Sequence, residues 1–196
     1  MKKPILLPVA AIGLCALVLL AMSFGLNGVA TANAQAEHLK TMQYLVPGSE
    51  SFTLEQISGE DPIIRSVHKG ETGFVVETVT QGYAGPITML IGVSKEGSVT
   101  GLTIRDMSET PGLGMQALTN WPFLAQFLRT EGDVAISTGS ADAFSGATGD
   151  TAEAEVYVDG ISGATVTSKA IARCVNAAVA YVTGADVDSG ATLWGG

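Results

Sequence analysis

The stretch from Pro4 to Ala36 carries no charged side chain, and its first two thirds are almost wholly apolar. At a rise of about 1.5 Å per residue, some twenty helical residues cover about 30 Å, the thickness of the hydrocarbon core of a bilayer. Lys2 and Lys3 precede this run, and positive charge before an apolar segment predicts a cytoplasmic N-terminus with the remaining chain on the other side. We therefore expect residues 1–28 to form a cytoplasmic stub and a single transmembrane anchor.

A cleaved signal peptide is the alternative interpretation of the same segment. Ala32-Asn33-Ala34 offers the small-residue pattern of a cleavage site. However, the apolar run is longer than the roughly 7–15 residues usual for the hydrophobic region of a signal peptide, which favours a retained anchor. Both interpretations place the domain on the extracytoplasmic or periplasmic side of the inner (cytoplasmic) membrane.

Charge and residue usage exclude several classes of protein. The formal net charge is −9, with 19 acidic against 10 basic residues, which argues against recognition of a nucleic-acid backbone. Only two histidines and two cysteines occur, so zinc fingers, haem attachment and disulfide scaffolds are poorly supported. His38 and His68 stand apart in polar segments, and no nucleophile–base pair is visible. We expect no metal site and no catalytic residue, and hence no independent turnover of a small substrate.

The chain beyond the apolar segment is long enough for one packed domain. We expect residues 29–55 to form a membrane-proximal linker or helix, residues 56–184 the domain, and residues 185–196 a flexible tail. Runs rich in β-branched residues, separated by turn clusters, predict an antiparallel meander; the expected strands cover residues 63–67, 73–80, 87–93 and 99–104.

The second half of the domain has mainly helical signals. A helix interrupted by Pro122 is expected over residues 115–128, and an acidic stretch over 130–160 is expected to be loop with one or two short strands. A last strand is expected at Glu155–Val158, followed by a helix with clear periodicity over residues 168–182. Strands and helices are segregated along the chain, which predicts an α+β fold.

The segment Asp159–Thr165 lies where the last strand gives way to this helix, which is expected to start between Thr165 and Ser168. Backbone N–H groups at a helix start favour anions, and the small residues Gly163 and Ala164 would let a ligand approach the backbone. Lys169 and Arg173, one turn apart, would add positive charge. The alternative is that the Ser and Thr side chains only cap the helix.

The tetrapeptide of this segment occurs twice in the chain. Ser145–Thr148 repeats Ser162–Thr165, but Gly149-Asp150 follows it and no helical periodicity comes behind. Thr165 instead leads into an amphipathic helix with two basic residues. Thr165 is therefore the better candidate for an anion site.

Three segments carry a resemblance to a known family. Asp159–Thr165 (Asp-Gly-Ile-Ser-Gly-Ala-Thr) resembles the flavinylation motif of the FMN-binding domain family. Glu109–Gly114 (Glu-Thr-Pro-Gly-Leu-Gly) is similar to the flavin-loop motif of the G subunit of Rnf-type ion-translocating electron transport complexes. Gly82–Ile87 resembles the early Gly-Tyr-x-Gly segment of the family. The three occur in the family's order behind an N-terminal anchor. The related C subunit of sodium-translocating NADH:quinone reductase shares the pattern on a usually longer chain.

The resemblance implies that a flavin transferase links FMN through its phosphate to Thr165. The resemblance and the residue pattern together give a set of candidate cofactor-site residues: Asp159, Ser162, Gly163, Ala164 and Lys169 around the attachment point, Glu109, Thr110, Gly112, Leu113 and Gly114 in the loop, and Tyr83. Of these, Asp159 is expected to position the turn or to serve recognition by the transferase, and Lys169 is included for its positive charge at the helix start. The sequence departs from the family at Asp106-Met107-Ser108, where a His or another basic residue is common. This departure bears on the flavin potential.

The function that the resemblance implies is that of a covalently flavinylated electron carrier. It would be one subunit of a membrane complex that couples electron transfer to ion translocation, with other integral-membrane and iron–sulfur or flavin subunits as partners. Two alternatives stay open. One is a stand-alone anchored flavoprotein that passes electrons to another acceptor, and the other is a non-redox anchored binding protein.

Overall fold

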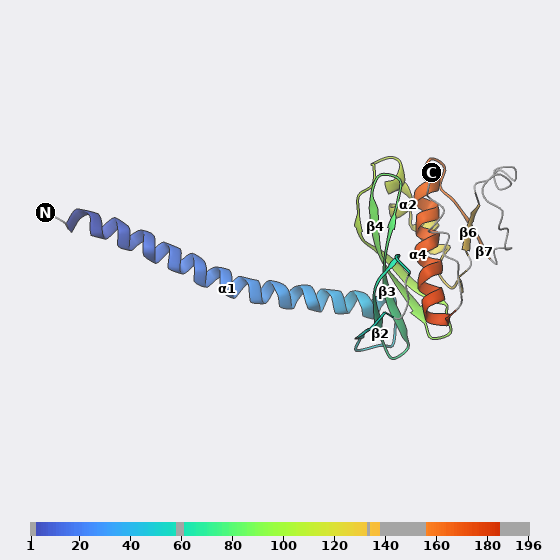
Figure 1. Cartoon of the computed structure of the whole chain (residues 1–196), viewed down its shortest axis with the longest axis horizontal. Helices are drawn as coiled ribbons and strands as arrows, with labels where there is room; N and C mark the ends of the chain where they lie inside the picture. Colours follow the sequence, from blue (N-terminus) through green and yellow to red (C-terminus); the bar gives the residue numbers. More distant parts are fainter. Residues whose placement is uncertain (1–2, 58–60, 133, 138–155, 185–196) are drawn as a thin grey trace. The chain divides into compact units, whose positions relative to one another are not determined.

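The computed structural model describes residues 3–57, 61–132, 134–137 and 156–184 (Figure 1). The chain divides into two compact units, Met1–Thr41 and Met42–Gly196. Helix α1 (Lys3–Leu45) makes up the described part of the first unit and ends in the second. Within the residues described, no helix is both long enough and apolar enough to cross a membrane.

The second unit is built on a five-stranded antiparallel sheet in which the strands follow one another in chain order. The strands are β1 (Thr53–Glu55), β2 (Ile64–Lys69), β3 (Gly73–Gln81), β4 (Pro86–Ser94) and β5 (Val99–Met107). The expected antiparallel meander is therefore confirmed, with β1 as an additional edge strand. Strand β5 runs three residues beyond the expected end at Ile104 because its pairing with β4 continues to Met107 through an irregularity near Thr88.

The described part of the second unit also contains two more strands and a long helix. Strands β6 (Val134–Ser137) and β7 (Val156–Asp159) pair in parallel as a separate sheet. Helix α4 (Thr165–Thr183) packs against β3 and β4 and also against β6, so it lies between the two sheets (Figure 1). The expected closing strand and helix are both present, and the α+β fold is confirmed.

The helix expected over residues 115–128 is instead two short helices, α2 (Gly114–Thr119) and α3 (Trp121–Ala125). Pro122 lies in the first turn of α3, where its missing N–H costs nothing. The Asn120 side chain accepts a hydrogen bond from the Phe123 N–H at 2.9 Å and caps this helix. A helix running through Pro122 would lose a backbone hydrogen bond, so the chain ends one helix and starts another.

Two apolar clusters cover the two faces of the large sheet. The larger one packs α4, through residues such as Ile171 and Val175, onto the face that carries Val76 and Met89. The smaller cluster lies on the opposite face and consists of Met42, Leu45, Val46, Val75 and Leu90.

Residues expected in the linker thus belong to the compact unit. Leu45 is 0% exposed and Val46 is 1% exposed, and β1 pairs with β2. The unit therefore starts before the expected boundary at residue 56, because these side chains bury apolar surface against the sheet.

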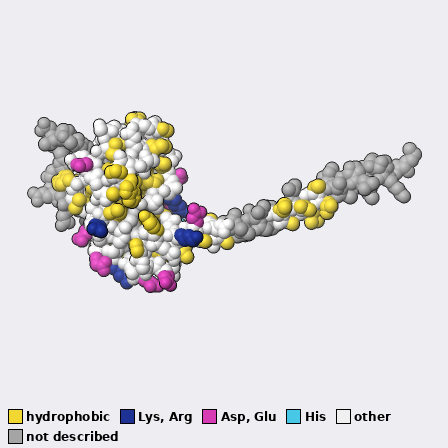
Figure 2. Space-filling model, turned by 180° about the vertical axis from the view of Figure 1, so that it is seen from behind, with side chains coloured by type: hydrophobic (Ala, Val, Ile, Leu, Met, Phe, Trp, Pro, Cys, Tyr) yellow, Lys and Arg dark blue, Asp and Glu magenta, His cyan; other side chains and the backbone are white. Residues whose placement is uncertain are grey.

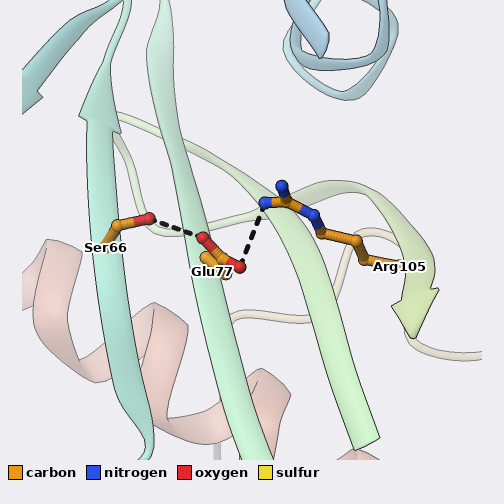
Figure 3. A network of polar contacts seen from close by, with 3 residues as sticks. All are labelled: Ser66, Glu77 and Arg105. Atoms are coloured by element: carbon orange, nitrogen blue, oxygen red, sulfur yellow. Dashed lines mark hydrogen bonds and ion pairs between the residues drawn. The ribbon is translucent and has the colours of Figure 1, made fainter. Parts of the chain in front are cut away.

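The face with the smaller cluster also carries a polar network. Glu77 on β3 accepts hydrogen bonds from Ser66 Oγ at 2.9 Å and from Arg105 Nη1 at 3.1 Å (Figure 3). Figure 2 shows apolar side chains near the centre of the visible face of the second unit and charged side chains toward its edges. The repeated tetrapeptide Ser145–Thr148 and the expected tail 185–196 lie outside the described residues.

Candidate functional site

The segments Gly82–Ile87 and Glu109–Gly114 and the helix that follows the third segment meet at the carboxylate of Glu109, a residue that is only 7% exposed. Its Oε1 accepts hydrogen bonds from the Tyr83 N–H at 2.6 Å and from Thr167 Oγ1 at 3.2 Å. Its Oε2 accepts one from the Ala84 N–H at 3.2 Å. One buried group therefore joins the turn before β4, the loop after β5 and the first turn of α4.

Two glycines allow this close approach. A Cβ at Gly82 would meet Glu109 Oε1 and would lie 2.6 Å from Ile87 Cδ1. A Cβ at Gly114 would lie 2.5 Å from Glu109 Cδ and 2.6 Å from Thr167 Oγ1. Ordinary contacts of a Cβ start near 3.4 Å, so any side chain at either position would displace the carboxylate.

The start of α4 is not capped by a Ser or Thr side chain. The N-cap residue is Ala164, and it makes no side-chain hydrogen bond to the helix. The Ser168 hydroxyl donates to the Ala164 carbonyl at 2.9 Å, which is a bond within the first turn. The simple capping interpretation of the segment is therefore wrong. The first N–H groups of a helix lack partners within the helix and attract anions.

Thr165 is the first residue of α4, is partly buried, and lines a cavity of about 290 Å³. The other residues around this cavity are Ser137, Asp159, Gly160, Ile161, Ser162 and Gly163. Gly163 has a φ of +82° and no atom within 4 Å of where a Cβ would lie. The predicted attachment segment thus bends around an open space that Thr165 faces.

A second cavity, of about 600 Å³, lies beside the same helix turn. Val166 and Arg173, two turns apart on α4, line it together with Gly82 and Tyr83. Arg173 is half-buried, and burial lowers the pKa of its guanidinium. Lys169, which the sequence placed at the site, is exposed and lines neither of these two cavities. Of the two basic residues expected to add positive charge here, only Arg173 therefore lines one of these cavities, and its seven-residue spacing from Val166 places both on one helix face.

The remaining predicted residues fall into two groups. Thr110, Gly112 and Leu113 are exposed, and Gly112 has a φ of +80° with open space around it. Gly114 and Ala164 are buried. Tyr83 is 60% exposed and Leu113 is 40% exposed, so both segments that contain them present a large apolar side chain at the surface.

The predicted residues differ in what they contact. The Glu109 carboxylate, expected at the cofactor, contacts other parts of the protein. Asp159 ends β7, is exposed, and donates its backbone N–H to Gln126 Oε1 at 3.0 Å. The departure at Asp106-Met107-Ser108 lies at the end of β5, where Asp106 Oδ1 accepts from the Met107 N–H at 2.9 Å. Within the described part of the chain, no three His, Cys, Asp or Glu side chains are grouped to hold a metal ion.

Several known proteins are similar to this chain. The family model of the FMN-binding domain matches residues 82–180. The chain is 30% identical to the G subunit of the ion-translocating oxidoreductase complex of Methanosarcina acetivorans, over 91% of this chain and 93% of that protein. It is 33% identical over 108 residues to the G subunit of the Na⁺-translocating ferredoxin:NAD⁺ oxidoreductase complex of Acetobacterium woodii, over 55% of this chain and 47% of that protein.

A solved structure is also similar. The crystal structure of the C subunit of Na⁺-translocating NADH-quinone reductase from Parabacteroides distasonis aligns with a TM-score of 0.49 and 20% identity. The alignment covers 69% of this chain and 76% of that one. The match to the Acetobacterium woodii protein spans slightly less than half of that protein's length.

Proposed function

The chain belongs to the FMN-binding domain family, and from this premise we propose that it is the flavin-carrying electron-transfer subunit of a membrane complex. Relatives in two organisms are named as G subunits of ion-translocating oxidoreductase complexes. By that likeness, the complex would couple electron transfer to ion translocation. The other subunits of the complex would donate and accept the electrons, and this chain would hold the flavin between them.

The observation that carries the proposal is the position of Thr165. Its hydroxyl lies at the start of α4, beside an open cavity, and the N-cap residue Ala164 has no side-chain group that could cap the helix. A phosphate there would meet the free N–H groups of the first turn, and a helix start stabilises a negative charge by about 0.3–1 kcal/mol. The open backbone at Gly163 leaves room for the rest of the cofactor. These features fit an FMN phosphate.

We further propose that the linkage is covalent. A bond would form between Thr165 Oγ and the phosphorus of the FMN phosphate, in a step catalysed by a flavin transferase. With a flavin–adenine dinucleotide as donor, the pyrophosphate P–O bond breaks, AMP leaves, and the hydroxyl proton passes to solvent. No electron moves in this step. Ser162 and Asp159, which line the same cavity, would contact the phosphate end or the transferase.

The ring of the flavin would lie against exposed side chains of the turn at Tyr83 and of the loop that contains Glu109. Tyr83 and Leu113 offer apolar surface, and the bare backbone at Gly112 together with the Thr110 hydroxyl offers hydrogen-bonding groups nearby. Arg173, in the cavity that Tyr83 also lines, would place a positive charge near the ring. FMN supplies the redox chemistry when bound, and the protein orients it and tunes its potential.

The membrane attachment rests on the sequence. The uncharged apolar stretch behind Lys2 and Lys3 would anchor the domain to the inner membrane with the N-terminus in the cytoplasm. The domain would then lie on the extracytoplasmic side. A flavin lost there would not easily be replaced, which gives a reason for a covalent bond.

The proposal is tested by following covalent flavin. The full chain is expressed with a flavin transferase, denatured, separated on a gel and examined for flavin fluorescence. The wild-type chain and the Thr148→Ala variant should give a fluorescent band, and Thr165→Ala should give none. The Thr148→Ala variant is the matched control, because it removes the same residue type from the repeated tetrapeptide. A band that persists in Thr165→Ala, or that is lost in Thr148→Ala, would refute the assignment of the site.

A further inference from the structure

We propose that Glu109 is a positioning residue for flavin attachment. Its buried carboxylate holds the turn at Tyr83 and the first turn of α4 together, so that the Thr165 hydroxyl faces its cavity. The inference rests on the proposed function and goes beyond it. It assigns to Glu109 a role that acts through other residues, although the sequence pattern places this residue among those that touch the cofactor.

The first support is the completeness of the contacts. The carboxylate accepts from two backbone N–H groups, of Tyr83 and Ala84, and from the Thr167 hydroxyl, at distances between 2.6 and 3.2 Å. The donors come from segments 25, 26 and 58 residues away in the chain. Both oxygens are engaged, and the residue is almost fully buried. A buried carboxylate held in this way keeps its neighbours in place, because losing one hydrogen-bond donor would leave part of a buried negative charge unsatisfied, which costs free energy.

The second support is the chemistry of the three donors. An ionised carboxylate only accepts hydrogen bonds, so it suits the two backbone N–H groups, which can only donate, and a hydroxyl that donates to it. The amide of a glutamine at this position would turn an N–H₂ group toward at least one of these donors. The hydroxyl of Thr167 is also 0% exposed, so water cannot easily replace the missing acceptor.

The third support is the geometry of the helix. Thr165 and Thr167 are two positions apart, so their side chains point about 200° apart around the helix axis. Thr167 faces inward to Glu109, and this rotation of α4 turns Thr165 toward the cavity formed with Ser162 and Gly163. The same carboxylate fixes the backbone of Tyr83, whose side chain lines the neighbouring cavity. Releasing Glu109 would therefore loosen both sides of the proposed cofactor site together.

The test compares rates of covalent flavin incorporation in the full chain, with a flavin transferase and flavin–adenine dinucleotide. Glu109→Gln should lower the initial rate at least tenfold, and Thr167→Val should lower it severalfold. Thr167→Ser, which keeps the hydroxyl, should incorporate flavin at the wild-type rate. The double variant Glu109→Gln with Thr167→Val should be no slower than Glu109→Gln alone, because the two changes remove one shared interaction.

Glu77→Gln is the matched control. Glu77 is a carboxylate that is less deeply buried than Glu109 and has two hydrogen-bond donors, and its partners lie on the opposite face of the sheet from α4 (Figure 3). It should incorporate flavin within twofold of the wild-type rate. Three results would overturn the proposal. They are a wild-type rate in Glu109→Gln, a rate in Glu77→Gln as slow as in Glu109→Gln, and a double variant in which the rate reductions of the two single variants multiply.

A second measurement does not depend on the flavin. In the flavin-free chain, Glu109→Gln should increase hydrogen exchange at the Tyr83 and Ala84 amides at least tenfold and leave the β3–β4 ladder unchanged. Unchanged exchange at these two amides would overturn the positioning role. A wild-type chain that never incorporates flavin would instead refute the proposed function, and amide exchange would still decide the role of Glu109. If Glu109→Gln does not fold, Thr167→Val carries the same test, because it keeps the carboxylate and removes one donor.

Discussion

Replacing Gly114 by Ala adds one methyl group at a crowded point of the candidate site. The new Cβ would lie 2.5 Å from Glu109 Cδ and 2.6 Å from Thr167 Oγ1, where ordinary contact begins near 3.4 Å. Both neighbours must move by close to 1 Å, and they are the two partners of one hydrogen bond of 3.2 Å. Neither group lies at the free end of a flexible surface side chain, because both residues are buried.

The expected cost follows from these displacements. Overpacking a well-filled interior costs about 1–3 kcal/mol, and weakening a buried hydrogen bond to a charged group costs about 1.5–3 kcal/mol. The gain in helix propensity from Gly to Ala is at most about 1 kcal/mol and is smaller at the first position of α2. We therefore expect the free energy of unfolding to fall by about 3 kcal/mol. For a chain of this size, that lowers Tm by about 9 °C.

Gly112→Ala is the matched control for this prediction. Gly112 belongs to the same loop and has a φ of +80°, but nothing lies within 4 Å of its Cβ position. Its cost should be about 1 kcal/mol, from backbone strain alone. Scanning calorimetry of the full chain would compare the two variants. A Gly114→Ala variant that melts no lower than Gly112→Ala would refute the reasoning that a packed carboxylate fills the space beside Gly114.

Two further predictions concern the core around α4. Burial raises the pKa of the Cys174 thiol to about 12, so the folded chain keeps a proton that the unfolded chain loses near pH 9. The free energy of unfolding should therefore decrease by up to about 1.4 kcal/mol per pH unit as the pH rises between these values. The Cys174→Ala variant should lack this contribution to the pH dependence of its stability, and an identical pH slope in the variant would contradict the prediction. Asn176 accepts from the Val134 N–H at 3.0 Å and donates to the Val134 carbonyl at 3.1 Å, so Asn176→Ala should lower stability by about 1–3 kcal/mol and speed hydrogen exchange in β6 more than in β4. Equal changes in both strands would show that Asn176 does not bridge α4 to β6.

The meander could be predicted from the sequence because its contacts are local. Runs of β-branched residues alternate with short turn clusters such as Lys95–Ser98, and each strand pairs with the next one in the chain. The closing helix was predictable for a similar reason, since its apolar periodicity is clear from Ile171 to Val182. In both cases, a pattern within about twenty residues decides the structure.

The features that were missed depend on partners far away in the chain. The parallel pairing of β6 with β7 requires a connection through residues 138–155, and four-residue strands give no sign of direction. The start of the domain at Met42 depends on the burial of Leu45 against a strand that follows thirty residues later. The three donors to Glu109 could not be found from spacing either. Motif resemblance singled out the Glu109 loop, but only the structure reveals which atoms the carboxylate contacts.

The glycines of the candidate site serve two different physical purposes. Gly82 and Gly114 are crowded, and they let the Glu109 carboxylate approach the backbone. Gly112 and Gly163 are open and have positive φ angles, so they bend the chain where a ligand can lie against it. Alanine at the crowded positions should impair the assembly of the site, whereas alanine at the open positions should mainly strain the loops. Flavin attachment at Thr165 would then depend on both kinds of glycine. The crowded glycines allow Glu109 to hold α4 in place, and the open glycines leave space for the ligand beside the helix.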